Sequence, residues 1–226
     1  MIIAVCGYSD SGKTSFIEQL LPHLEEYRVA VIKHTNQERI DTAGKDTARY
    51  RAAGARASAL IASEETTVFL SGGGEVDRLV EMLDAEVVLL EGFKTSDYEK
   101  IWLGDGRGSN VVLQDPSIQA AISYIRRKAD VERALRQLPG LDCGDCDYRS
   151  CQELAQAVAA GDATVEDCIV SHGGVLVTVD GTVIPLKPFV QSFVEGTVRG
   201  MLQSLKGVED TMGKTVQITL PGGPRI

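Results

Sequence analysis

Along the N-terminal part of the chain, continuous apolar runs alternate with apolar residues at helical spacing. Runs at residues 1–6, 28–33 and 85–94 predict buried strands, and the third of these is the strongest in the chain. Between the first two runs, apolar residues three and four positions apart in residues 16–24 predict a helix, which Pro22 shortens because it has no amide hydrogen to donate. A helix between two strands indicates a βαβ unit with parallel strands.

The remaining segments complete the pattern of helices and strands. Further strands are expected at residues 57–62, 66–70, 100–104, 118–123 and 215–220, and a β-hairpin at residues 175–186. Further helices are expected at residues 44–53, 75–83, 130–138, 151–160 and 188–205. Asp180-Gly181 lies at the centre of the hairpin, where this pair favours a type I′ turn.

Together these elements predict an α/β fold with a P-loop NTPase-like, mostly parallel sheet and flanking helices. A small four-cysteine cluster module and a C-terminal hairpin, helix and strand are expected to follow it. Pro139-Gly140 interrupts the helical pattern and marks a domain boundary. The expected domains are a nucleotide-binding domain at residues 1–138, an iron–sulfur module at 139–171 and a C-terminal segment at 172–226.

Composition and charge exclude several classes of function. The chain has 226 residues and a formal net charge of -9, which argues against binding to nucleic acids or to anionic membranes. The N-terminus has no secretory signal, and no window approaches the roughly 20 apolar residues of a membrane span. We therefore expect a cytoplasmic protein, in which clustered cysteines indicate metal or redox chemistry, since structural disulfides are rare there.

The sequence GYSDSGKT, from Gly7 to Thr14, matches the phosphate-binding loop G-x-x-x-x-G-K-T. It follows a predicted strand and opens a predicted helix, as the motif requires. In such a loop the backbone amides and the helix N-terminus cradle phosphate oxygens, Lys13 reaches the β- and γ-phosphates, and Thr14 binds Mg²⁺. The residues expected to bind the nucleotide are Gly7, Tyr8, Ser9, Asp10, Ser11, Gly12, Lys13, Thr14 and Ser15.

Glu91 ends the strongest predicted strand. A carboxylate at this position can hold Mg²⁺ through water or orient an attacking water molecule, although a glutamate at a strand end can also be a simple loop contact. We expect Lys13 and Glu91 to be the catalytic residues, and Thr14 and Glu91 to be the magnesium ligands.

The segment VIKHTNQERIDTAGKDTARYRAAGA, residues 31–55, lies between GYSDSGKT and LLEGFK. With these motifs in this order, residues 1–136 resemble the MobB family, the molybdopterin-guanine dinucleotide biosynthesis protein B. The resemblance implies a homodimer that binds GTP with Mg²⁺ and hydrolyses it weakly. It also implies an adapter role for a guanylyltransferase, which attaches GMP to the molybdenum or tungsten pterin cofactor, molybdopterin.

The resemblance also implies roles for particular residues. It places Gly7, Gly12, Lys13, Thr14 and Glu91 in the nucleotide site, and Lys33, His34, Asp41, Lys45, Asp46 and Arg49 at the cofactor or its phosphate. Gly44 is carried over with them, without a separate role. Lys33, Lys45 and Arg49 would bring positive charge to a polyanionic ligand in an acidic protein. A solvated helix face at Lys45 and Arg49, and a structural role for His34, remain open. No N-K-x-D motif occurs, so the preference for GTP rests on the resemblance alone.

Four of the five cysteines follow the spacing C-x2-C-x4-C-x16-C, at Cys143, Cys146, Cys151 and Cys168. Four thiolates suit Zn²⁺ or an iron–sulfur cluster, but a zinc ribbon would usually contain two C-x-x-C pairs and this segment has one. The segment is similar to the small 4Fe-4S domain of anaerobic redox and corrinoid enzymes, which implies a 4Fe-4S cluster. Asp147 departs from that pattern, where glycine is common. The cluster could be structural, sense redox state or dock a partner.

Two alternative functions remain open from the sequence. The same P-loop and cysteines would suit an NTP-dependent carrier that delivers an iron–sulfur cluster or a metal to another enzyme. A small-molecule kinase is the third hypothesis, but no motif for a hydroxyl substrate stands out. Apolar residues at helical spacing in residues 188–205 indicate core packing or dimerisation, and Gly196 and Gly200 would allow a close helix approach.

Overall fold

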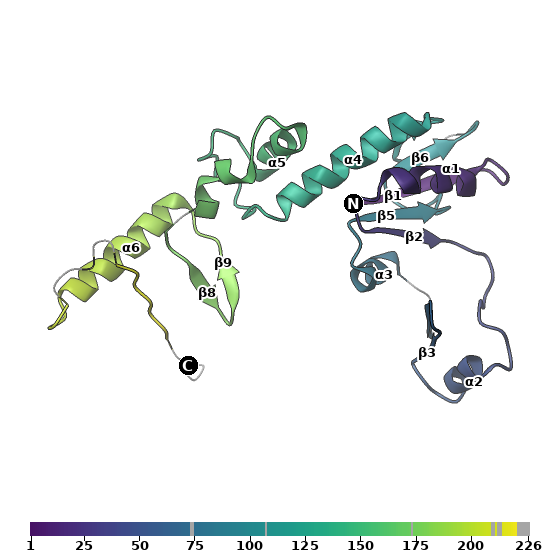
Figure 1. Cartoon of the computed structure of the whole chain (residues 1–226), viewed down its shortest axis with the longest axis horizontal. Coiled ribbons are helices and arrows are strands. Elements are labelled where there is room, and N and C mark those ends of the chain that lie inside the picture. Colours follow the sequence, from purple (N-terminus) through teal and green to yellow (C-terminus); the bar gives the residue numbers. More distant parts are fainter. Residues whose placement is uncertain (73–74, 107, 173, 209–210, 212–213, 221–226) are drawn as a thin grey trace. The chain divides into compact units, whose positions relative to one another are not determined.

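The computed structural model describes residues 1–72, 75–106, 108–172, 174–208, 211 and 214–220, except for the side chains of residues 171 and 172. The chain divides into two units, Met1–Ala129 and Asp130–Ile226, and each is described by itself. Figure 1 shows the elements of both. The domain limits expected from the sequence stay a prediction, since this division by contacts falls inside one helix.

Apolar runs form the central sheet of the N-terminal unit. Its strands are β1 Ile2–Gly7, β2 Val29–Lys33, β5 Val87–Glu91, β6 Lys100–Leu103 and β7 Val111–Gln114, in the order β2-β5-β1-β6-β7 (Figure 1). Every neighbouring pair is parallel, which confirms the predicted α/β fold with a parallel sheet. The carboxyl ends of the strands therefore meet at one edge, where Val5 and Lys33 flank Glu91 on the neighbouring strands.

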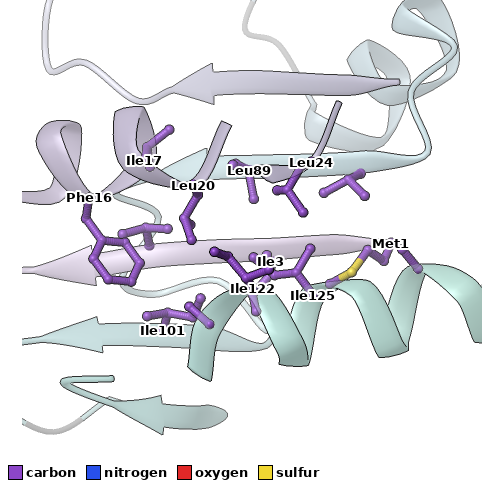
Figure 2. Packing of buried hydrophobic residues seen from close by; sticks show 14 of the residues in the cluster. Met1, Ile3, Phe16, Ile17, Leu20, Leu24, Leu89, Ile101, Ile122 and Ile125 are labelled. Atoms are coloured by element: carbon purple, nitrogen blue, oxygen red, sulfur yellow. The ribbon is translucent and has the colours of Figure 1, made fainter. Parts of the chain in front are cut away.

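Two helices cover one face of this sheet with apolar side chains. α1 Lys13–Leu20 and α4 Ile118–Leu135 contribute to the main core, and Figure 2 shows their side chains together with those of the strands. α1 stops at Leu20, and the short 3₁₀ helix Leu21–His23 follows, as expected from Pro22. The labelled residues of this core are Met1, Ile3, Phe16, Ile17, Leu20, Leu24, Leu89, Ile101, Ile122 and Ile125.

A second core contains Cys6 and Trp102 with partly buried residues of α3 Val76–Leu83. Cys6 is fully buried in β1, in agreement with its interpretation as a small apolar residue. Burial raises the pKa of the Cys6 thiol, although the charges of nearby lysines oppose this shift. This thiol donates a hydrogen bond to the carbonyl oxygen of Gly92, at 2.7 Å.

Lys100 is a fully buried lysine at the start of β6. Its ammonium group donates to the carbonyl oxygens of Ser96, of Tyr98 at 3.2 Å and of Ser109 at 3.0 Å. No carboxylate pairs with it in the part of the chain that the structure describes. Lys100 thus connects the segment that follows β5 with the segment that precedes β7.

A helix and a small antiparallel sheet lie between β2 and α3 in the sequence. They are α2 Asp46–Ala52, β3 Ala57–Ile61 and β4 Thr66–Leu70. α2 ends just before Gly54, which has a φ of 109°, as the pattern predicts. The strands β3 and β4 pair with each other in a sheet separate from the central one.

The C-terminal unit contains the helix predicted within the cysteine segment, α5 Cys151–Ala160. The 3₁₀ helices Val165–Asp167 and Ile169–His172, the hairpin of β8 Val177–Val179 and β9 Thr182–Ile184, and α6 Pro188–Gln203 follow it. Asp180 and Gly181 have φ values of 50° and 79°, which confirms the expected turn with positive φ at both positions.

Two predicted elements were wrong. Residues 118–123 lie in α4 and are not a strand, because Ile118, Ala121, Ile122 and Ile125 recur at helical spacing and face the main core. The helix expected at residues 130–138 is confirmed as far as Leu135, as the end of this same helix. Residues 215–220 form no strand. Among the described residues, β8 and β9 pair only with each other, so residues 215–220 have no strand to pair with. β7 was missed, since its run VVLQ is short.

None of the described helices has both the length and the apolar character that crossing a membrane requires.

Candidate functional site

The phosphate loop joins the end of β1 to the start of α1. Gly7 lies where a side chain cannot fit, since a Cβ atom there would stand 2.3 Å from Ser11 Oγ and 2.7 Å from the Leu103 carbonyl oxygen. Gly12 precedes α1 with a φ of 78°, in the left-handed region that favours glycine. The two glycines therefore give the loop a tight curve around the helix N-terminus.

Lys13 folds back over the loop. Its Nζ atom donates to the Tyr8 carbonyl oxygen at 2.6 Å and lies 3.4 Å from both the Gly7 carbonyl oxygen and Ser11 Oγ. All of these partners are neutral, so the positive charge of Lys13 stays available to a phosphate. Tyr8 is 61% exposed beside them, where its ring could contact a nucleotide.

The Glu91 side chain, at the end of β5, contacts both the start of α1 and the end of β2. The Thr14 hydroxyl donates to Glu91 Oε1 at 3.0 Å, and Lys33 Nζ lies 2.9 Å from the same oxygen. Burial tends to raise the pKa of the Glu91 carboxyl, but the hydrogen bonds from Lys33 and Thr14 and the charges of Lys33 and Lys13 lower it by more. Glu91 is therefore ionised, as a magnesium ligand must be.

His34 follows β2 beside this carboxylate. Its backbone amide donates to the Glu91 carbonyl oxygen at 3.1 Å, and its ring packs edge-on against Phe93 at 5.5 Å between centroids. The structure thus brings Lys33 and His34, two of the residues expected at the cofactor phosphate, next to Glu91.

The other residues expected at the cofactor phosphate lie on or near α2. Asp41, Lys45 and Asp46 line a pocket of about 470 Å³ with residues of β3 and β4, whereas Arg49 pairs with Asp46 at 3.3 Å. Asp41 is bound to Arg51 at 2.5 Å, and its hydrogen bonds from Arg51 and Thr47 outweigh burial and lower the pKa of its carboxyl.

Arg51 was not predicted from the sequence. It lies five residues after Asp46 in α2 and stacks over the Phe69 ring at 5.2 Å, in addition to binding Asp41. The sequence contained one signal for this contact: Arg51 lies four residues after Thr47, so both side chains are on the same face of the helix and both can reach Asp41.

The four cysteines of the C-terminal unit share one small core. Cys151 and Cys168 are buried in it, and Cys143 and Cys146 pack against it as partly buried residues. Among the described residues, no three histidine, cysteine, aspartate or glutamate side chains are close enough together to hold a metal ion. The chemistry of the donor set nevertheless fits a metal centre, because four thiols without a disulfide are gathered around a single apolar cluster.

The local backbone explains how the cysteines are positioned. Ser150 caps α5 by accepting from the Glu153 amide at 3.1 Å, and Asp142 accepts from the Cys151 amide at 2.7 Å. Asp147 has a φ of 65°, the left-handed conformation that explains why glycine is common at this position in similar domains.

The electrostatics of the first cysteine follow from its acidic surroundings. A hydrogen bond from the Asp145 backbone lowers the pKa of the Cys143 thiol, but burial and the Asp145 carboxylate raise it by more. The Asp145 carboxylate and burial thus oppose the free thiolate of Cys143.

Comparison with known proteins adds two family matches. The family described as molybdopterin guanine dinucleotide synthesis protein B matches residues 2–124, and a family described as an Fe-S cluster matches residues 138–170. The two ranges correspond to the phosphate-loop fold and to the cysteine segment.

Individual relatives agree with the first match. A protein of Methanocaldococcus jannaschii, named as a molybdopterin-guanine dinucleotide biosynthesis adapter protein, is 33% identical over 97% of both chains. An adapter protein of the same name from Haemophilus influenzae is 34% identical, over 45% of this chain and 62% of its own. The crystal structure of Bacillus subtilis MobB is 31% identical and covers 47% of this chain and 69% of its own, with a TM-score of 0.39.

Proposed function

Because the chain belongs to the molybdopterin guanine dinucleotide synthesis protein B family and carries an Fe-S cluster domain, we propose that it is a GTP-binding adapter in molybdenum cofactor biosynthesis. It would bind GTP with Mg²⁺ and assist a separate guanylyltransferase that attaches GMP to molybdopterin. Its own hydrolysis of GTP would be weak.

The contact between Thr14 and Glu91 carries the nucleotide part of this proposal. A hydroxyl and an ionised carboxylate meet at the ends of β1 and β5, beside the amides of the phosphate loop and the Lys13 ammonium. This is the donor set that holds a Mg²⁺–triphosphate complex: the amides and the lysine bind phosphate oxygens, and the hydroxyl binds the metal. Slow hydrolysis is expected because, among the residues that the structure describes, no arginine or glutamine contacts Thr14 or Glu91 to stabilise the transition state.

The cysteine segment supports a 4Fe-4S cluster. Cys143, Cys146, Cys151 and Cys168 contribute four thiolates from around one core, which is the ligand set of such a cluster. The cluster would supply a redox-active or a stabilising centre. The residues of this chain would hold it by their sulfur atoms and surround it with the apolar side chains of α5.

The test of the function is a nucleotide titration followed by an activity assay. Calorimetry with GTP and with ATP, each with Mg²⁺, should show tighter binding of GTP. Addition of a guanylyltransferase and molybdopterin to the same protein should then give faster formation of the dinucleotide than the transferase alone. Preference for ATP together with no effect on guanylation would contradict the proposal and favour a cluster carrier.

Replacement of Lys13 by alanine should weaken GTP binding by about 1.5–3 kcal/mol, the range for hydrogen bonds to charged groups. The variant loses a phosphate contact and a compensating charge, while the loop keeps its glycines. Calorimetry measures the change. Glu91→Gln is the matched comparison: it should leave binding near the wild-type value but reduce hydrolysis. Equal GTP affinity of Lys13→Ala and the wild type would show that the phosphates bind elsewhere.

We further propose that the protein is a homodimer. The family resemblance implies it, and the α6 face supports it: Phe189 is 81% exposed and Phe193 65% exposed, an apolar surface that a second copy would cover. Light scattering at micromolar concentration should give twice the chain mass of 24.3 kDa. A single-chain mass with nucleotide and cluster present would refute the dimer.

A further inference from the structure

A second pocket lies directly behind the carboxylate of the nucleotide site. It has a volume of about 490 Å³ and is lined by residues 92–96 together with His34 and Asn36. Gly92, the first of these residues, follows Glu91 in the chain. The pocket therefore begins one peptide bond away from the expected magnesium ligand, at the carboxyl ends of β2 and β5.

The walls of this pocket are held by contacts from the core of the same unit. Beneath Gly92, the buried Cys6 thiol donates to the Gly92 carbonyl oxygen at 2.7 Å. At the far end, Lys100 donates to the Ser96 carbonyl oxygen, and Ser96 Oγ donates to the Phe93 carbonyl oxygen at 2.8 Å. Segment 92–96 is thus anchored at both ends, so the pocket is formed before any ligand arrives.

The lining groups favour an anion. They include Lys94, His34, Asn36 and Thr95, whose side chains can donate hydrogen bonds, and no aspartate or glutamate is among the lining residues. Lys94 Nζ lies 5.0 Å from the centre of the Tyr8 ring, and no described carboxylate pairs with it. Lys33, by contrast, is neutralised by Glu91. In a chain with a net charge of -9, the uncompensated charge of Lys94 marks this pocket as a site for negative charge.

We infer that this pocket binds the phosphomonoester of the second substrate, the acceptor that receives the nucleotide. The inference rests on the proposed function. A dinucleotide joins its two halves through a pyrophosphate, so the acceptor must bring a phosphate of its own. The phosphate loop already accommodates the triphosphate. The pocket next to Glu91 has the donors for the other phosphate, and Tyr8, in contact with Lys94, connects the two sites.

Calorimetry on the protein loaded with Mg²⁺ and guanosine 5′-(β,γ-imido)triphosphate tests the inference, since the phosphate loop is then occupied. The probes are 6-hydroxymethylpterin phosphate, the same pterin without the phosphate, and inorganic phosphate. The phosphate ester should bind one per chain, and the alcohol at least about tenfold more weakly, because it lacks the charged acceptor. Binding of inorganic phosphate at the same site would show that the phosphate alone is recognised.

Lys94→Ala should weaken binding of the ester by about tenfold and leave binding of the alcohol unchanged, whereas Lys94→Arg should retain most of the affinity. Lys94 is exposed, so neither substitution disturbs the core. Lys206→Ala, at another exposed lysine, is the matched control and should bind the ester like the wild type.

Equal affinity of Lys94→Ala and the wild type for the ester would overturn the inference, as would loss of ester binding whenever the nucleotide is present. Either result leaves the proposed function open to its own test, because GTP affinity and stimulation of the transferase are measured separately. If Lys94→Ala binds GTP normally but binds the ester weakly, the second site is established independently of the first.

Discussion

Serine in place of Cys151 is expected to abolish iron binding. The wild-type protein, purified without oxygen, should contain about four irons per chain and absorb broadly near ~400 nm, as a cluster with four thiolate ligands does. Cys151 begins α5 and is buried in the core shared by all four cysteines, so its loss removes a ligand that no described neighbour replaces. Iron analysis and the absorbance spectrum measure the change.

The C-terminal unit should also lose stability in this variant. Its core is small, and two of its buried residues, Cys151 and Cys168, are cysteines themselves. A small core of this kind usually needs a metal or another cross-link, so the binding of the cluster contributes to folding. Far-ultraviolet circular dichroism of the iron-free variant should therefore show thermal unfolding at a lower temperature than in the wild type.

Cys6→Ala provides the control for the cluster. Cys6 lies in β1 of the other unit and belongs to a different core, so this variant should keep all of its iron. Cys151→Ser should in turn keep GTP binding close to the wild-type value, since no residue of the phosphate loop belongs to its core. Stoichiometric zinc without iron in the reconstituted wild type, or full iron content in Cys151→Ser, would contradict a cluster held by these cysteines.

Lys100→Met is expected to destabilise the N-terminal unit by about 2–4 kcal/mol. Methionine has a similar length but leaves the carbonyl oxygens of Ser96, Tyr98 and Ser109 without their donor. Hydrogen bonds to a charged group contribute about 1.5–3 kcal/mol each. The variant also avoids the cost of removing the ammonium charge from water, about several kcal/mol, so the net effect is smaller than the sum of the three hydrogen bonds.

Denaturation followed by tryptophan fluorescence measures this effect. Trp102 is the only tryptophan of the chain and lies two residues after Lys100 in β6, 4% exposed, so its emission reports the unfolding of this unit. Lys128→Met is the matched control: Lys128 pairs with Glu99 at 2.9 Å on the surface, and such a pair contributes about 0–1 kcal/mol. Equal midpoints for Lys100→Met and the wild type would show that water replaces the ammonium at no cost.

The geometry of the phosphate loop could be predicted from the sequence because it is local. Glycine is needed at position 7 because a side chain has no space there, and it is favoured at position 12 because φ is positive there. Glu91 could be placed from its strand, since parallel strands end at the same edge of the sheet. The C-terminal turn followed in the same way from Asp180-Gly181.

The parts that were missed depend on contacts between distant segments. Residues 118–123 were expected to form a strand, although Ile118, Ala121, Ile122 and Ile125 recur at helical spacing; in the structure this apolar face packs into the main core as part of a helix. Lys100 begins the strand predicted at residues 100–104, and nothing in the sequence indicated that it is buried, because two distant loops supply the carbonyl oxygens around it. The pocket next to Glu91 likewise combines residues that follow β2 with residues that follow β5, two segments that are far apart in the chain.

Helix α4 makes the two units hard to separate. Its first half supplies Ile122 and Ile125 to the core of the N-terminal unit, and its last turns supply Val131 and Ala134 to the core around the cysteines. A fragment that began at Asp130 would retain only the end of the helix, too short to form alone in water. A fragment that kept all of α4 would expose the apolar face of its first half. Protein engineers who wish to graft the cysteine module onto another enzyme would therefore have to redesign this helix, and not merely choose a cutting point.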